Sequence, residues 1–182
     1  MVSRRALLAG LAFSASARAE APDLWAALRA GGHVAVMRHA TAPGVGDPPG
    51  FRLEACATQR NLSGAGQQEA ARIGAAFRAQ GLGTLPVWSS QWCRCLETAR
   101  LLGLGPVEAL PALNSFFQAS GEQAAATAAL RRWIADRAPR GAALLVTHQV
   151  NITALTGLYP ASGEVAVLRA DSSPLGRWRL PG

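Results

Sequence analysis

The stretch His33–Ala40, HVAVMRHA, decides the fold class of this 182-residue chain. Its first five residues form a compact apolar run, typical of a buried strand, and the polar pair Arg38-His39 follows directly. Two more apolar runs, Pro86–Ser89 and Ala143–Thr147, also precede polar residues, and helical patterns separate the three runs. Strands that alternate with helices predict an α/β fold, a three-layer α/β/α sandwich with a mostly parallel central sheet.

The remaining elements are predicted outward from these strands. The segment Thr41–Gly50 is rich in glycine and proline and indicates a loop, and Ser63 is a candidate N-cap for the long helix that follows it. The expected helices are Asp23–Ala30, Gly64–Gln80, Gln91–Leu102, Glu122–Arg137 and Val150–Thr156. The other expected strands are Val107–Leu110, Glu164–Arg169 and Arg177–Leu180.

The N-terminus has the pattern of an export signal. Arg4 and Arg5 precede a short apolar stretch, and Ala17-Arg18-Ala19 fits the small-x-small cleavage pattern. We therefore expect a signal peptide over residues 1–19, a mature domain over residues 20–182, and a periplasmic or secreted protein. The twin arginines favour the twin-arginine route, and an ordinary secretory signal is the alternative. The short apolar stretch predicts no stable membrane insertion after cleavage.

The positive charge comes entirely from 18 arginines, because the chain contains no lysine. This absence excludes a Walker A loop, a pyridoxal Schiff base and an S-x-x-K acyl enzyme. The predicted signal peptide contains three arginines, so 15 of the 18 oppose 11 acidic residues in the mature chain. They form no basic stripe, so we expect no nucleic-acid binding and a mild preference for anionic substrates.

The three cysteines do not suggest a metal site. Cys93 and Cys95 have C-x-C spacing, and neither a second cysteine pair nor a histidine pair accompanies them. In an oxidising compartment Cys56 can pair with Cys93 or with Cys95, and three free buried thiols are the alternative.

Polar residues follow three predicted strands at their carboxyl ends, where ligands bind in such sheets. His39 and Arg38 follow the first strand, Arg94 begins the helix after the second, and His148 follows the Ala143–Thr147 strand. Arginines bind phosphate oxygens through paired donors, and a neutral histidine among them can attack phosphorus. The third histidine, His33, begins the first strand about 20 Å from His39 and is predicted to be structural.

These residues resemble the motifs of the histidine phosphatase superfamily, which includes the phosphoglycerate mutases and acid phosphatases. The carrying motifs are Met37–Ala40, Leu62-Ser63-x-x-Gly66, Ser89-Ser90-x-x-x-Arg94 and Val146–His148, in the family's order. The resemblance implies that His39 is the nucleophile and that Arg38, Arg94 and His148 hold the phosphate. It implies no cofactor and no metal.

The general acid is where the sequence departs from that family. The mutase-like branch has a glutamate where Leu113-Asn114-Ser115 has serine, and the acid phosphatase branch has an aspartate where this chain has Gln149. The expected substitute is Glu122, with Asp47 and Glu54 as alternatives. Each of them has a structural alternative role, a helix-start acid or a solvated loop residue.

Several segments, including the one from Cys56 to Leu62, resemble an exported bacterial branch similar to lipopolysaccharide core heptose phosphate phosphatases. The expected function is therefore an exported phosphomonoesterase with a phosphohistidine intermediate on His39. The expected partner is a small phosphorylated substrate, such as a cell-envelope sugar phosphate. The alternative is a non-catalytic envelope protein that binds phosphorylated ligands in the same pocket.

Overall fold

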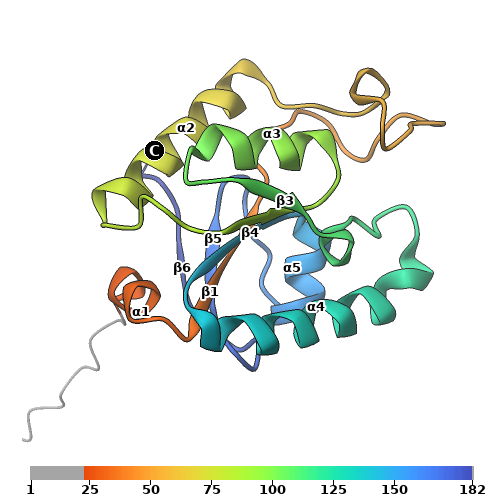
Figure 1. Cartoon of the computed structure of the whole chain (residues 1–182). Coiled ribbons are helices and arrows are strands. Elements are labelled where there is room, and N and C mark those ends of the chain that lie inside the picture. Colours follow the sequence, from red (N-terminus) through yellow and green to blue (C-terminus); the bar gives the residue numbers. More distant parts are fainter. Residues whose placement is uncertain (1–22, 182) are drawn as a thin grey trace, which may run out of the picture.

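The structure, a computed structural model, describes residues 23–181 as one six-stranded sheet between two layers of helices (Figure 1). The strands are β1 (His33–Arg38), β2 (Val87–Ser89), β3 (Val107–Ala109), β4 (Ala143–Thr147), β5 (Val165–Arg169) and β6 (Pro174–Trp178). The helices are α1 (Leu24–Ala30), α2 (Gly64–Ala79), α3 (Cys93–Leu102), α4 (Gln123–Arg137) and α5 (Gln149–Thr156). The predicted sandwich is confirmed, and the predicted signal peptide lies outside the described residues.

The sheet has the strand order β3-β2-β4-β1-β5-β6. Neighbours from β3 to β1 are parallel, whereas β5 is antiparallel to β1 and β6 is antiparallel to β5. The sheet is thus mostly parallel, as predicted, with a hairpin at one edge. Because β4 lies between β2 and β1, the carboxyl ends of these three strands are neighbours.

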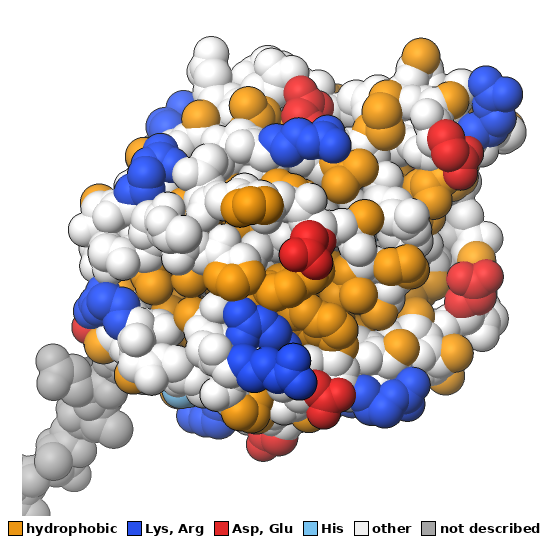
Figure 2. Space-filling model, viewed as in Figure 1, with side chains coloured by type: hydrophobic (Ala, Val, Ile, Leu, Met, Phe, Trp, Pro, Cys, Tyr) orange, Lys and Arg blue, Asp and Glu red, His pale blue; other side chains and the backbone are white. Residues whose placement is uncertain are grey.

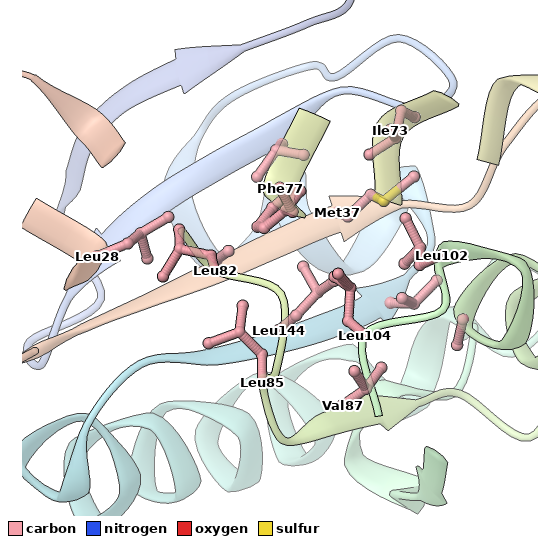
Figure 3. Close-up of a cluster of buried hydrophobic side chains, with 14 of the residues drawn as sticks. Leu28, Met37, Ile73, Phe77, Leu82, Leu85, Val87, Leu102, Leu104 and Leu144 are labelled. Atoms are coloured by element: carbon pink, nitrogen blue, oxygen red, sulfur yellow. The ribbon is translucent and has the colours of Figure 1, made fainter. Parts of the chain in front are cut away.

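The core has two halves because successive strand residues point to opposite faces of the sheet. Met37 of β1 and Leu144 of β4 face α2 and α3, where they pack with Phe77 and Leu102 (Figure 3). Val36 and Leu145 face α4 and α5 on the other side. Each fully buried side chain of this size contributes about 1.5–3 kcal/mol, so both helical layers are held firmly against the strands that carry the polar residues.

Strand β6 differs from its prediction. It was expected over Arg177–Leu180 but begins at Pro174. Proline is tolerated in an edge strand, and Gly176 lies so close to α1 that an added Cβ would approach Leu24 Cδ2 to 2.8 Å. Proline and glycine thus hide this strand from a pattern of side-chain types. The other boundaries shift by at most two residues, as at α3, which was expected from Gln91 and begins at Cys93.

The surface carries mixed charge. Figure 2 shows arginines interspersed with acidic side chains on the viewed face, without a continuous basic stripe. None of the helices in the described part of the chain is long and apolar enough to span a membrane.

Candidate active site

The ends of β1, β2 and β4 are held together by backbone hydrogen bonds that continue the sheet. The amide of His39 donates to Thr147 O at 2.9 Å, and the amide of Ser90 donates to Val146 O at 2.9 Å. Beside these ends lies a cavity of about 190 Å³. Its lining includes the four residues predicted to bind and attack phosphate, namely Arg38, His39, Arg94 and His148.

His39 is held as a neutral base with a defined tautomer. Its Nδ1 lies 2.8 Å from Ala40 O, and a carbonyl only accepts, so Nδ1 carries the hydrogen and Nε2 keeps its lone pair. Burial is the main cause that lowers the pKa of His39 to about 3; the hydrogen bond to Ala40 opposes this shift, and the charges of Arg94 and Arg38 contribute to it. The imidazole is therefore unprotonated at neutral pH and available as a nucleophile.

Two of the arginines that line the cavity have unused donors. The Nε atoms of Arg38 and Arg94 are buried, and neither has a hydrogen-bond partner among the described residues. Burial and the neighbouring Arg94 both lower the pKa of Arg38, as expected where cationic groups are crowded. Since buried donors are nearly always paired in proteins, these two nitrogens point to an anion as the missing partner.

Asp47 occupies part of this cationic site. Arg94 donates to both of its carboxylate oxygens, from Nη1 at 2.8 Å and from Nη2 at 3.2 Å, and Trp92 Nε1 donates to it at 3.0 Å. Burial raises the pKa of Asp47, but hydrogen bonds from Arg94 and from the amide of Arg60 outweigh it and lower the pKa overall. An ionised carboxylate therefore sits where a phosphate oxygen would be attracted.

Arg60 is a site residue that sequence reasoning missed. It lines the cavity, its Nε donates to Gly46 O at 2.8 Å, and its amide donates to Asp47 Oδ1 at 3.0 Å. It adds a third guanidinium group and fixes the loop that carries Asp47. The only feature of the sequence that pointed to Arg60 was its place in the segment from Cys56 to Leu62, which carries part of the resemblance. That segment follows no predicted strand, so the argument from strand ends did not include Arg60.

His148 is positioned by a short polar chain. Its Nε2 lies 2.8 Å from Ser90 Oγ, which donates to Asn114 Oδ1 at 3.3 Å, and Arg94 Nη2 lies 3.4 Å from Nδ1. A neutral ring satisfies all three contacts if Nε2 carries the hydrogen. Burial lowers the pKa of His148 well below its usual value, and the nearby His39 adds to this. Ser90 and Asn114 lie in quoted motifs, but their positioning role was not predicted.

The structure separates the three candidate acids. Glu122 is exposed beside the start of α4, and Glu54 is exposed in a second pocket next to Cys56; neither lines the cavity. Asp47 does line it. Ser115 and Gln149 line it as well, so the positions where the resembled branches have acids are at the site but hold no carboxyl group here.

Cys56 and Cys93 form a disulfide, which confirms one of the two predicted pairings. Cys95 is free and buried, with its sulfur 3.5 Å from His148 Nε2. Burial raises the pKa of its thiol to about 12, so it remains protonated and is a poor nucleophile.

The histidine that was predicted to be structural, His33, lies outside the cavity. His33 begins β1, away from the cavity lining, and its Nδ1 lies 3.0 Å from Gly31 O. Among residues 23–181, no group of three or more histidine, cysteine or acidic side chains could hold a metal ion.

The sequence matches no protein-family model and no curated protein. Solved structures do match. The protein histidine phosphatase SixA, complexed with tungstate, is 18% identical with a TM-score of 0.54 and covers 78% of this chain and 92% of its own. YhfR from Bacillus stearothermophilus is 16% identical with a TM-score of 0.57, and covers 75% and 90%.

A third match is a protein from Escherichia coli K-12 assigned as an alpha-ribazole-5'-P phosphatase. It is 17% identical with a TM-score of 0.56, and covers 84% of this chain and 97% of its own. At this level of identity the likeness concerns the fold. The chain therefore has the α/β fold of the protein histidine phosphatase SixA and of these other structures.

Proposed function

We propose that the protein is a phosphomonoesterase that works through a phosphohistidine intermediate on His39. The observation that carries this proposal is the neutral imidazole of His39 in a cavity where buried nitrogens of Arg38 and Arg94 have no partner among the described residues. Guanidinium groups suit phosphate oxygens, and a fixed neutral imidazole suits attack on phosphorus.

The reaction has two balanced steps. The lone pair of His39 Nε2 attacks phosphorus, the ester P–O bond breaks, and the alcohol leaves with a proton from a carboxylic acid. Water then gives a proton back to the carboxylate as it attacks phosphorus, the N–P bond breaks, and inorganic phosphate is released with His39 and the acid restored. Arg38, Arg94, Arg60 and His148 surround the transferred group, and removing one such donor typically costs about 100–1000-fold in rate.

Asp47 is the acid that the cavity offers. Substrate phosphate would compete with it for Arg94, the main group that lowers the pKa of Asp47. Loss of those hydrogen bonds and the arrival of a nearby dianion both raise a carboxyl pKa. Binding would thus convert Asp47 from a partner of Arg94 into a proton donor close to the leaving oxygen.

The nucleophile is tested with p-nitrophenyl phosphate. His39→Ala should abolish turnover without loss of fold, because the other imidazole in the cavity, His148, has one ring nitrogen engaged by Ser90 and the other by Arg94. His33→Ala, at the other end of the same strand, is the matched control and should keep full turnover. Rapid quenching with labelled substrate should trap an acid-labile, base-stable phosphoenzyme. Wild-type turnover in His39→Ala, or label on another residue, would refute the proposal.

The acid is tested by comparing leaving groups. Asp47→Asn should lower kcat/KM for an alkyl phosphate much more than for p-nitrophenyl phosphate, whose leaving group hardly needs a proton. Glu122→Gln should change neither rate, because Glu122 lies outside the cavity. If Glu122→Gln instead produces the selective loss, the original sequence expectation is right and Asp47 only positions Arg94.

We further propose that the protein is exported and that its substrate is a sugar phosphate of the cell envelope. The N-terminal signal pattern and the Cys56–Cys93 disulfide support export, since disulfides persist in oxidising compartments. N-terminal sequencing of protein from the native cell envelope should begin at Glu20. An intact chain found in the cytosol would contradict export.

The non-catalytic alternative, a protein that only binds phosphorylated ligands, is not favoured. The tautomer and the low pKa of His39 are features that attack on phosphorus needs and that simple anion binding does not. A protonated histidine would bind a phosphate more strongly than a neutral one.

A further inference from the structure

A second hollow adjoins the catalytic cavity. It lies between the 116–123 segment and α5, has a volume of about 400 Å³, and is named here the aromatic groove. Phe117, Gln149 and Val150 line both the cavity and the groove, so the two spaces meet at these side chains. The pocket beside Cys56 shares no lining residue with the cavity.

Exposed apolar side chains gather around this junction. In the described part of the chain, the exposed large hydrophobic residues are Val45, Leu101, Phe117 and Tyr159. Val45 lines the cavity, and Phe117 and Tyr159, which are 53% and 75% exposed, line the groove. Exposed apolar patches mark binding sites, and here three of the four exposed side chains line the cavity or the groove that adjoins it.

The size of the cavity indicates what the groove would bind. Sites for drug-sized ligands usually measure about 300–1,000 Å³, so the cavity of about 190 Å³ has room for a phosphoryl group and little more than the first atoms of a ring-bearing leaving group. The rest of the substrate must leave through the mouth, and the groove continues from it.

The lining of the groove selects by chemistry. Among residues 23–181, no charged side chain lines the groove, in contrast to the arginine-rich cavity. The side-chain amides of Gln123 and Gln149 and the hydroxyl of Thr153 line it instead. Gln149 Nε2 donates to Thr153 Oγ1 at 2.8 Å, and its Oε1 accepts no hydrogen bond from the described residues. Aromatic faces combined with amide groups suit a ring that carries hydroxyl groups and no charge.

Building on the proposed function, we infer that the aromatic groove binds the leaving group of the substrate, an uncharged, hydroxylated ring such as a sugar. The ring lies against Tyr159 and Phe117 while its phosphoryl group reaches His39. A leaving group with its own negative charge would lose its hydration without gaining a cationic partner in the groove.

Three phosphomonoesters of primary alcohols test this inference with matched leaving oxygens. Glucose 6-phosphate carries the uncharged ring, ethyl phosphate has none, and 3-phosphoglycerate carries a carboxylate. We expect kcat/KM for glucose 6-phosphate to exceed that for each of the other two by about tenfold or more, the usual range for a filled apolar contact. Equal values for glucose 6-phosphate and ethyl phosphate would overturn the inference.

Two variants probe the groove directly. Tyr159→Ala should lower the glucose 6-phosphate to ethyl phosphate ratio of kcat/KM by about tenfold. Leu101→Ala is the control, because Leu101 is an exposed apolar residue of α3 that lines neither the cavity nor the groove. It should leave this ratio unchanged. Gln123→Arg should raise kcat/KM for 3-phosphoglycerate by about tenfold, a gain that misfolding cannot produce.

The failure of this inference is distinguishable from failure of the proposed function. If ethyl phosphate is hydrolysed in a manner that depends on His39, but neither Tyr159→Ala nor Gln123→Arg changes the ratios, the groove does not bind the leaving group and the phosphatase proposal stands. If no phosphomonoester is hydrolysed, the proposed function itself fails.

Discussion

Single residues at this site are defined by the state in which the fold keeps them. His39 and His148 are both buried and both have lowered pKa values, with burial as the main cause. A histidine on a surface would be partly protonated near pH 6.5. Here the fold buries both rings almost completely, which keeps His39 neutral and His148 a neutral partner of Arg94.

The same burial predicts a stability that falls in acid. Below pH 6.5 the unfolded chain protonates both histidines, whereas the folded chain leaves them neutral, so protons favour unfolding. From pH 6.5 towards the folded pKa of His39, about 3, each histidine lowers the free energy of unfolding by up to ~1.4 kcal/mol per pH unit. Urea unfolding at pH 7 and pH 5 measures this, and unchanged stability would contradict it.

A variant separates the two histidines. His39→Asn removes one titrating ring and keeps His148, so the loss of stability between pH 7 and pH 5 should be about half as steep. The carboxyl of Asp47, whose pKa is lowered, adds its own loss only below its usual value near 4. The interval from pH 6.5 to 4.5 therefore reports the histidines.

Part of the site was predictable at this scale and part was not. Arg38, His39 and His148 follow apolar runs directly, so their positions at strand ends could be predicted before the sheet was known. Asp47 and Arg60 belong to the long connection between β1 and α2, whose path depends on contacts with Trp92 and Arg94. No local sequence pattern specifies those contacts, so the sequence alone favours Glu122 over Asp47 as the general acid.

Among the elements, the N-terminal end of α2 holds the chain segment that directly follows His39. The carbonyl of Thr41 accepts from the amide of Ser63 at 3.1 Å, and the amide of Thr41 donates to Glu69 Oε2 at 2.8 Å. Ser63 caps α2 by accepting from the amide of Gly66 at 3.1 Å. The cap was predictable from Ser63, whereas the hydrogen bonds to Thr41 depend on how closely α2 approaches the segment that contains Thr41.

Gly66 permits that approach. A Cβ at this position would lie 2.0 Å from Thr41 O, whereas a Cβ at Gly64 would meet nothing within 4 Å. Gly66→Ala should therefore lower the free energy of unfolding by about 1–3 kcal/mol, the usual cost of overpacking. Gly64→Ala, two residues earlier in the same helix, should leave it unchanged or slightly higher because alanine favours helices.

Chemical denaturation of both variants checks this prediction. Gly66→Ala should also lower kcat, because moving Thr41 moves the segment that joins it to His39. Equal stability of the two variants would contradict this prediction, because it would show that α2 and Thr41 move apart to accommodate the added Cβ without a loss of folding free energy.

At the scale of the whole molecule, the disulfide joins the two halves of the site. Cys56 lies in the connection that carries Asp47 and Arg60, and Cys93 begins the helix that carries Arg94. The sequence left open whether Cys56 pairs with Cys93, with Cys95 or with neither, since C-x-C spacing alone does not say which sulfur faces outward. The fold decides it by burying Cys95 against His148.

Removing this bond should be costly. With a sequence separation of 37 between the two cysteines, the chain-entropy relation gives a stabilisation of about 3–4 kcal/mol. The double variant Cys56→Ser, Cys93→Ser should lose that amount in urea unfolding, and a reducing agent should then have no further effect on it. A variant as stable as the oxidised wild type would refute this expectation.

The disulfide also closes a covalent ring that contains α2 and β2. A protease that cuts the backbone once inside this ring, for example after Arg78 near the end of α2, does not produce two molecules. His39 remains on the piece that ends in the cut, Arg94 remains on the other, and the disulfide keeps them together. Nicked protein would therefore migrate as one species until it is reduced, and its damage would be invisible to any assay of size alone.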